Sequence, residues 1–157
     1  MLFLRALFAF LLVPGVVAFL LPLLIAYFDP WRGAEWAPGL MPVVVGAFIL
    51  LWCVRDFYVA GKGTLAPWSP PQHLVTVGLY RLVRNPMYVG VLTLVTGWAI
   101  YFTSLILGGY ALFLAIRFHM HVRGYEEPWL ASEFGKEWER YKTAVPRWRP
   151  RLRPWRG

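Results

Sequence analysis

The chain has 157 residues, of which 59% are apolar and only 15% are charged, whereas a typical soluble domain is about half apolar and about a quarter charged. This composition excludes a disordered chain, a collagen-like repeat and a disulfide scaffold. The single cysteine, Cys53, excludes an internal disulfide and a CxxC metal site. The length predicts one domain over residues 1–157. The net charge is +8, and the basic residues flank apolar runs, which favours a membrane protein over a nucleic-acid-binding protein.

Two apolar segments in residues 1–60 predict two N-terminal transmembrane helices. Residues 6–28 carry no charge, and as a helix of about 34 Å they are long enough for a hydrocarbon core of about 30 Å. We therefore expect a helix near 3–28 that is kinked at its two prolines. Its apolar stretch is longer than that of a cleaved signal peptide, so we interpret it as a retained anchor. A second helix is expected over about 39–60.

A loop rich in proline is expected over residues 64–78. A short helix near Tyr80 should follow it and stop before Pro86, because the residue that precedes a proline disfavours the α conformation. The basic residues orient the chain, since residues 55–86 carry four Lys or Arg whereas residues 29–39 carry one. The positive-inside rule then predicts an integral, multi-pass membrane protein whose termini and 55–86 segment face the cytoplasm.

The uncharged run over residues 87–116 is too long for one span and predicts a C-terminal helical hairpin. A break near Thr103 gives a third helix at about 86–102 and a fourth at about 105–124. The fold class is therefore all-α, with about four transmembrane helices. Small residues on one stripe of the third helix predict a close approach to another helix. These residues are Gly90, Thr93 and Gly97.

The chain becomes polar after Arg123, and residues 126–142 predict an amphipathic cytoplasmic helix. Its apolar residues recur at helical spacing and are expected to pack on the bundle or at the interface. They are Leu130, Phe134, Trp138 and Tyr141. Residues 147–157 form a basic, aromatic and proline-rich tail, which we expect to lie on anionic membrane headgroups.

Polar residues are concentrated in two places that could carry chemistry, residues 76–90 and residues 117–127. Ionisable groups at membrane depth are costly, so their presence there favours a functional site. The alternative is an ordinary solvated helix end with an ion pair between Arg123 and Glu127. The two histidines of the second segment lie two positions apart and point to different helix faces, so no metal site is expected.

Each of these two places carries a motif. The first has Gly78, Tyr80, Arg84, Pro86, Tyr88 and Gly90, with Asn85 before the proline. The second has Glu126, Glu127, Leu130, Phe134, Gly135, Glu137, Trp138, Tyr141, Lys142, Val145 and Pro146. In this order the motifs resemble the integral-membrane methyltransferase family that includes isoprenylcysteine carboxyl methyltransferase and phosphatidylethanolamine N-methyltransferase, in which a histidine stands at the position of Asn85. The resemblance covers about residues 72–146, which we take as the cofactor-binding core.

The resemblance implies that S-adenosylmethionine is the methyl donor, bound by the third and fourth helices and the segment that follows them. The family's cofactor contacts carry over to Gln72, His73, Leu74, Val75, Tyr80, Asn85, Pro86, Met87, Tyr88 and Glu126. We expect Glu126 to pair with a cationic or hydroxyl part of the cofactor. Tyr80 or Tyr88 is expected to pack on its adenine.

Methyl transfer is a displacement at the methyl carbon, so alignment of the reactants is the main task of the protein. An amine acceptor must also lose a proton, and Glu127, His119 and His121 are candidates to accept it. Arg117 and Arg123 are candidates for binding a phosphate or carboxylate of the substrate, although Arg123 lies one position beyond the column of the family's substrate-side arginine. The catalytic candidates are thus Glu127, Arg123 and His119.

The acceptor is predicted to be a lipid or lipid-like molecule. A phospholipid amine ranks first, because the run Asn-Pro-Met-Tyr at residues 85–88 is closer to the phospholipid enzymes. A carboxyl or thiol acceptor of the isoprenylcysteine type is the alternative, and a small hydrophobic metabolite also stays open. Another class stays open too: a non-enzymatic membrane scaffold with an anionic-lipid-binding tail, because Asn85 replaces the family histidine.

Overall fold

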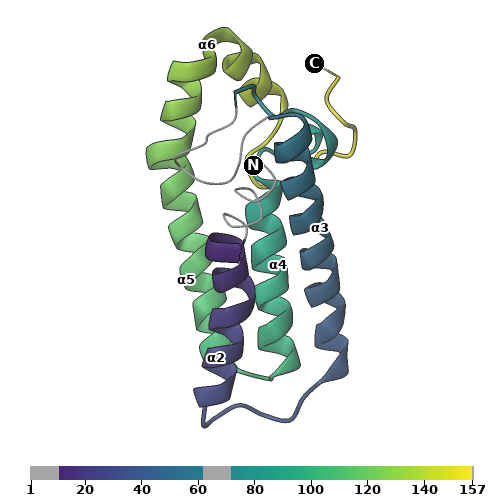
Figure 1. Cartoon of the computed structure of the whole chain (residues 1–157), viewed down its shortest axis with the longest axis vertical. Helices are drawn as coiled ribbons and strands as arrows, with labels where there is room; N and C mark the ends of the chain where they lie inside the picture. Colours follow the sequence, from purple (N-terminus) through teal and green to yellow (C-terminus); the bar gives the residue numbers. More distant parts are fainter. Residues whose placement is uncertain (1–10, 62–71, 157) are drawn as a thin grey trace.

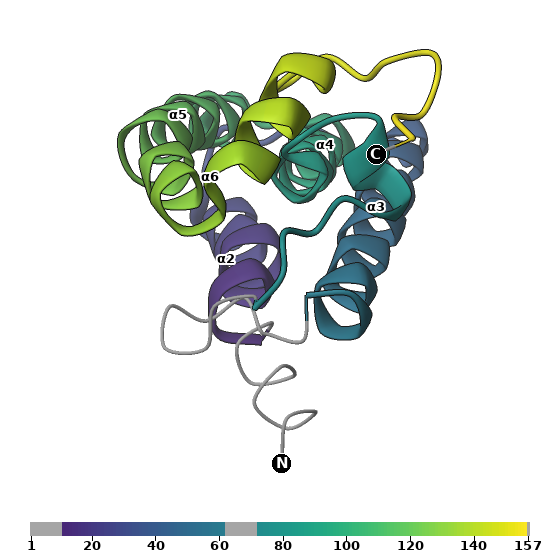
Figure 2. The same ribbon diagram turned by 90° about the horizontal axis from the view of Figure 1, so that it is seen from above.

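The computed structural model describes residues 11–61 and 72–156, and within these ranges every regular element is helical. The apolar helices run alternately down and up one bundle, and a further helix lies across one end of it (Figure 1, Figure 2). In chain order the elements are η1 (Leu11–Leu20), α2 (Leu21–Phe28), η2 (Ala37–Gly39), α3 (Leu40–Val59), η3 (Gly78–Arg81), α4 (Pro86–Tyr101), α5 (Leu105–His121), η4 (Val122–Glu126) and α6 (Glu127–Ala144). The predicted all-α class is therefore confirmed for the described part of the chain.

Two helical stretches are long and apolar enough to cross a membrane, Ala37–Val59 and Leu105–Ala144. Two shorter apolar helices accompany them, Pro14–Phe28 and Pro86–Tyr101. The bounds agree with the second and third helices expected from the sequence, and the arrangement is consistent with four apolar helices. The expected start of the first helix and most of the proline-rich loop lie outside the described residues.

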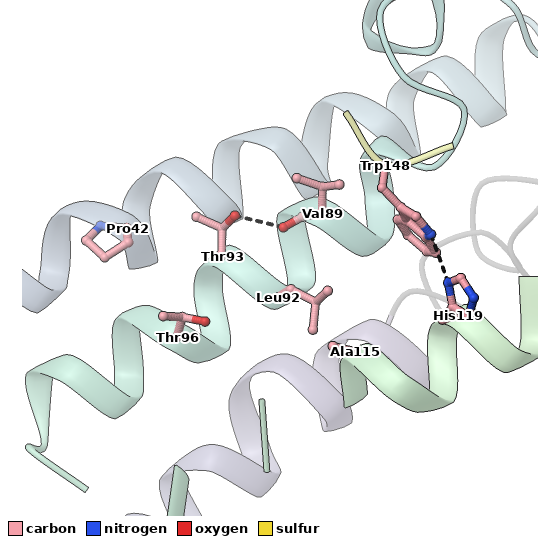
Figure 3. A pocket seen from close by; sticks show the side chains of 8 residues that line it. All are labelled: Pro42, Val89, Leu92, Thr93, Thr96, Ala115, His119 and Trp148. Carbon is pink, nitrogen blue, oxygen red and sulfur yellow. Dashed lines mark hydrogen bonds between the residues drawn. The ribbon is translucent and has the colours of Figure 1, made fainter. Parts of the chain in front are cut away.

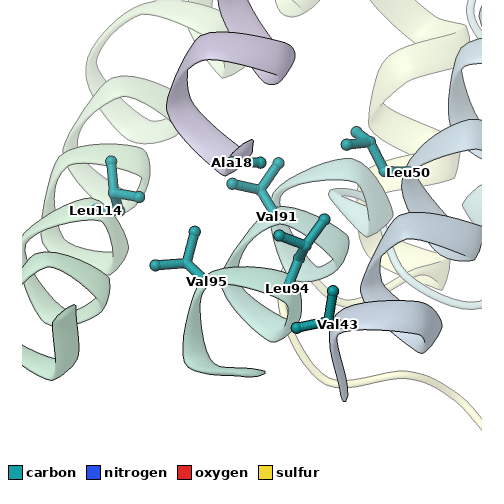
Figure 4. Close-up of a cluster of buried hydrophobic side chains, with 7 residues drawn as sticks. All are labelled: Ala18, Val43, Leu50, Val91, Leu94, Val95 and Leu114. Carbon is teal, nitrogen blue, oxygen red and sulfur yellow. The ribbon is translucent and has the colours of Figure 1, made fainter. Parts of the chain in front are cut away.

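Helix α4 lies at the centre of the bundle, and its buried side chains form the main core (Figure 4). Val91, Leu94 and Val95 of α4 are almost fully shielded from solvent. They meet side chains from three neighbours, Ala18 of η1, Val43 and Leu50 of α3, and Leu114 of α5. Because α4 is packed on several sides, the residues in its first turn are held in a fixed orientation at one end of the bundle.

Glycines bring α3 and α4 into backbone contact. A Cβ atom added to Gly46 of α3 would lie 2.5 Å from a backbone nitrogen of α4, and one added to Gly97 of α4 would lie 2.5 Å from a backbone nitrogen of α3. Gly90 lies in the same contact, near the Gly46 carbonyl oxygen. The predicted close approach is therefore confirmed for Gly90 and Gly97, and its partner is α3.

We expect Gly46→Ala to lower the midpoint of thermal unfolding, because the added methyl group would overlap backbone atoms of α4. Overpacking of this kind costs about 1–3 kcal/mol. Gly108→Ala is the matched control, since an added Cβ there meets no atom within 4 Å. Scanning calorimetry in detergent compares the two, and equal midpoints would contradict the backbone contact between α3 and α4.

The turn between α4 and α5 is short, as the predicted helical hairpin requires, and it is internally hydrogen-bonded. Thr103 adopts a positive φ of 47°, and the Ser104 hydroxyl accepts a hydrogen bond from the Leu107 nitrogen, which caps the start of α5. The same hydroxyl donates to the buried carboxylate of Asp29, which follows α2. This end of the bundle is therefore tied across three helices, and α4 and α5 form a tight antiparallel hairpin.

The structure differs from the sequence expectation where α5 leaves the apolar region. The fourth helix and the start of the amphipathic helix, expected as separate elements, are joined through the π-helical segment η4, and α6 is instead kinked at Gly135, which has a φ of 47°. Pro128 lies at the start of α6, directly after the π-helical segment. The predicted apolar stripe is confirmed as a packing face, in which Trp138 and Tyr141 are buried with Val145 and flanked by Leu130 and Phe134.

The C-terminal segment, residues 146–155, packs along the segment that leads into α4. The main-chain N–H of Arg84 donates to the Pro146 carbonyl oxygen at 2.9 Å, and the main-chain N–H of Arg151 donates to the Leu82 carbonyl oxygen at 2.9 Å. Figure 1 shows this segment at the same end of the bundle as α6. The start of the predicted tail is thus part of the folded protein, while the side chains of Arg149, Arg153 and Arg156 remain exposed.

Candidate functional site

The two motifs meet at the end of the bundle where α4 begins and α5 ends (Figure 1). The Tyr88 hydroxyl, in the first turn of α4, donates a hydrogen bond to the Glu126 carboxylate at the end of η4. His121 Nε2 lies 3.4 Å from the same carboxylate. Burial raises the pKa of Glu126, although the Tyr88 hydrogen bond and His121 act against this. A π-helical turn is frequent at functional sites, and here it ends on Glu126.

Glu127 lies between two arginines that come from distant parts of the chain. Arg84 Nη1 donates to Glu127 Oε1 at 2.9 Å, and Arg147 donates through Nε and Nη2 to the two carboxylate oxygens at 2.7 and 2.6 Å. Burial would raise the pKa of Glu127, but the Arg147 hydrogen bonds and the two positive charges lower it below its ordinary value. Glu127 is therefore an ionised clamp that joins α6, the segment before α4 and the C-terminal segment.

The Arg84 guanidinium is almost fully buried and packs on an aromatic ring. Its side chain is 9% exposed and lies over the Trp138 ring, with 5.4 Å from the guanidinium carbon to the ring centre. Burial lowers its pKa, which the Glu127 carboxylate partly opposes. Within the described residues, Arg84 Nε is buried without an acceptor. An unused buried donor costs free energy, so this position suits a ligand oxygen.

Aromatic rings surround the Tyr88–Glu126 pair. The Tyr88 ring centre lies 4.5 Å from that of Phe118 on α5 and 6.4 Å from that of Trp148 in the C-terminal segment. Aromatic faces attract cations, and a nearby carboxylate strengthens that preference. The combination therefore suits a positively charged group, such as a sulfonium or an ammonium.

A cavity of about 580 Å³ lies beside this cluster (Figure 3). Its lining residues come from α3, α4, α5 and the C-terminal segment and are Pro42, Val89, Leu92, Thr93, Thr96, Ala115, His119 and Trp148. Most of them are apolar, and the Thr93 hydroxyl is satisfied within its own helix by the Val89 carbonyl oxygen at 2.8 Å. Thr93 thus faces this cavity and is not part of the close helix contact that was predicted for it together with Gly90 and Gly97. The cavity suits an apolar chain with a polar group at the His119 end.

The structure brings several predicted site residues together at this end of the bundle. Tyr88, Glu126 and Glu127 meet as described, and His119 contacts Trp148. The Asn85 amide donates to the Arg147 carbonyl oxygen at 3.2 Å. Pro86 is buried at the start of α4, and Met87 packs against the main core.

The predicted cofactor-binding residues that precede α4 lie in three different environments, two of them buried and one exposed. Val75 and Tyr80 are buried against Cys53 of α3. Leu74 packs on the cluster formed by Trp138, Tyr141 and Val145, while Gln72 and His73 are exposed.

Arg117 of α5 and Arg123 of η4 are exposed, and the ion pair between Arg123 and Glu127, which belonged to the alternative of an ordinary solvated helix end, is not formed. Glu127 pairs with Arg84 and Arg147 instead. The physical reason is that Arg123 lies in the π-helical segment, where the i,i+4 alignment of an α-helix is lost. Arg117 and Arg123 both remain accessible to an acceptor. In the described ranges, no three His, Cys, Asp or Glu side chains gather closely enough to hold a metal ion.

Sequence reasoning missed three residues of this site, Arg84, Arg147 and Trp148. A signal for the arginines was present, because two adjacent carboxylates at the end of an apolar helix require cations nearby. Arg84 lies inside the first motif, and Arg147 directly follows the second. Trp148 carried no signal of its own, since a tail rich in arginine and tryptophan is also typical of a membrane surface.

Comparison with known proteins matches residues 35–137 to the phospholipid methyltransferase family. The cobalt-zinc-cadmium resistance protein CzcN of Cupriavidus metallidurans is 31% identical over 148 residues. That match covers 90% of this chain but 63% of the relative, so the chain spans less than two thirds of the relative's length. No solved structure matches.

Proposed function

Because the chain belongs to the phospholipid methyltransferase family, we propose that it is a membrane enzyme that transfers a methyl group from S-adenosylmethionine to the amine of a lipid acceptor. The observation that carries this proposal is the Tyr88–Glu126 pair, which lies among aromatic rings beside an apolar cavity. Such a site can hold two cationic groups in turn or together, the donor's sulfonium and the acceptor's ammonium.

The residues at the site fit the donor. Its carboxylate and hydroxyl oxygens match the unused Arg84 Nε, and its cationic groups match Glu126 and the Tyr88 ring. We therefore assign donor binding to Arg84, Asn85, Tyr88 and Glu126, and extend it to the other residues that the family resemblance implied. When bound, S-adenosylmethionine supplies an electrophilic methyl group on its sulfonium.

In this proposal the protein acts mainly by alignment. Tyr88 and Phe118 hold the reacting groups from α4 and α5, and Glu127 fixes Arg84 and the C-terminal segment around them. Glu126 is the better candidate to accept the proton of the amine at its carboxylate, because its pKa is raised whereas that of Glu127 is lowered. Glu127 is then a positioning residue.

The cavity beside α4 provides the place for the acceptor's apolar chain. Its lining is mostly apolar, and it lies between helices that we propose to span the membrane. We propose that the site and both termini face the cytoplasm, as the distribution of Lys and Arg indicates. The exposed arginines Arg149, Arg153 and Arg156 are then available to anionic headgroups.

The proposal is tested with methyl-labelled S-adenosylmethionine, the purified protein and a total lipid extract, followed by separation of the products. We expect label in a band derived from phosphatidylethanolamine. Label confined to a prenylated carboxyl or thiol compound would replace the amine with the isoprenylcysteine-type acceptor. If neither a labelled product nor donor binding is found in any lipid condition, the proposed enzyme activity is wrong and the membrane scaffold is favoured.

We expect Glu126→Ala to weaken binding of S-adenosylmethionine by about tenfold or more, since a buried charged partner contributes about 1.5–3 kcal/mol. Glu133→Ala is the matched control, because Glu133 is an exposed residue of α6. Calorimetric titration of the donor into protein in lipid nanodiscs measures both affinities. Equal affinities of the two variants would refute the assignment of Glu126 to the donor.

A further inference from the structure

Trp148 contacts His119 with a defined geometry at the polar end of the cavity. The indole Nε1 of Trp148 donates a hydrogen bond to Nδ1 of His119 at 3.1 Å (Figure 3). The two rings lie 6.1 Å apart between centres, with an angle of 31° between their planes. Both residues line the cavity, one from α5 and the other from the C-terminal segment.

This contact determines which nitrogen of His119 carries a proton. The indole N–H can only donate, so Nδ1 of His119 must present its lone pair. In the neutral imidazole the proton then lies on Nε2. His119 is therefore a hydrogen-bond donor whose one lone pair is already occupied, which makes it poorly suited to remove a proton from an amine.

Trp148 is held on both sides by contacts that leave it little freedom. Its neighbour Arg147 binds Glu127 through two hydrogen bonds, and the Arg147 carbonyl oxygen accepts from Asn85. Three residues further on, the Arg151 nitrogen is bonded to the Leu82 carbonyl oxygen. These restraints place the indole N–H at a fixed position relative to α5.

We propose that Trp148 is a positioning residue that locks His119 in the form protonated at Nε2, and that His119 thereby binds a phosphodiester oxygen of the lipid acceptor. This inference rests on the proposed function for the identity of the acceptor. The position fits, because His119 lies where α5 turns from apolar to basic, between Arg117 and Arg123. A phospholipid whose chain occupies the apolar cavity places its phosphate near that level.

The test compares Trp148→Phe, which keeps a ring and removes the N–H, with Trp155→Phe as the matched control. Trp155 lies in the same segment but packs on Tyr141, away from His119. Nitrogen-15 spectra of the imidazoles, assigned with His119→Gln, report the tautomer directly. We expect Trp148→Phe to mix the two tautomers of His119, and Trp155→Phe to leave the spectrum unchanged.

Kinetics then test the role in acceptor binding. Two acceptors are compared, phosphatidylethanolamine and a long-chain alkylamine that lacks a phosphate. We expect Trp148→Phe to raise KM for the phospholipid about fivefold to tenfold more than KM for the alkylamine, the value of one ordinary hydrogen bond. His119→Ala should remove the preference for the phospholipid over the alkylamine, measured as the ratio of their KM values. The conservative variant His119→Gln, which keeps an N–H donor, should retain part of that preference.

Two results would overturn the inference: an unchanged His119 tautomer in Trp148→Phe, or equal changes in KM for both acceptors. If the wild-type protein methylates neither acceptor, the proposed function fails and the acceptor half of the inference fails with it. The spectra still decide whether Trp148 positions His119, so the two failures are distinguishable.

Discussion

Replacement of Glu127 by glutamine should destabilise the protein by roughly 3 kcal/mol, because removing one member of a buried ion pair leaves its partners' charges uncompensated. The side chains of Arg84 and Glu127 are 9% and 13% exposed, and Arg147 at 27% is also largely shielded. Methyl transfer should fall by about a hundredfold, since misplacement of aligned groups has effects of that order. Chemical unfolding in detergent and the labelled-methyl assay measure the two effects.

Glu139→Gln is the control for this prediction. Glu139 also pairs with a cation, Lys142 at 3.2 Å, but both side chains are well exposed, and such pairs contribute little. The effect of Glu127→Gln should also depend on pH. The pKa of Glu127 is lower in the folded protein than its ordinary value of 4.5, so its stabilisation is complete above that pH and is lost as the pH falls through the folded-state pKa. A difference between variants that persisted at strongly acidic pH would contradict the ion-pair clamp.

Removal of residues 147–157 should reduce methyl transfer by about a hundredfold even in detergent, where no anionic surface is needed. The deletion takes away Arg147, which completes the Glu127 clamp, and Trp148, which contacts both His119 and Tyr88. A misplaced site has an effect of that size. The labelled-methyl assay in neutral detergent measures it directly.

A full-length variant separates this role from membrane attachment. Arg149→Gln, Arg153→Gln and Arg156→Gln combined remove exposed charges but leave the contacts of Arg147 and Trp148. We expect this variant to be active in neutral detergent and to bind vesicles of anionic lipid less well. Full activity of the truncated protein in detergent would show that the segment is an anchor and not a wall of the site.

The helices could be predicted from the sequence because their signals are local. Uncharged runs define α3 and α4, and the turn at Thr103 and Ser104 lies where a run too long for one span had to be divided. The continuity of α5 with α6 could not be predicted in this way. Whether a polar segment extends a helix through a π-helical turn depends on tertiary packing, here the burial of Trp138 and Tyr141 against neighbouring segments.

Tyr88 and Glu126 could be placed in the candidate site from the sequence, whereas Arg147 and Trp148 could not. Tyr88 and Glu126 belong to motifs at adjoining helix ends, so a hairpin brings them together. Arg147 and Trp148 reach the same place only because the chain folds back along residues 81–85. That return depends on backbone hydrogen bonds, which any residue other than proline can donate, so side-chain identity gives little indication of it.

The lengths of α4 and α5 determine which residues meet at the open end of their hairpin. The helices contain 16 and 17 residues and are therefore about 24 and 26 Å long, so the start of α4 and the end of α5 reach about the same height from their shared turn. One residue inserted in either helix would rotate everything beyond it by about 100° and shift it by about 1.5 Å. The length of the hairpin is therefore constrained by the contacts at its open end, whereas exposed side chains on its outer face such as Leu112 and Phe113 are not constrained by them.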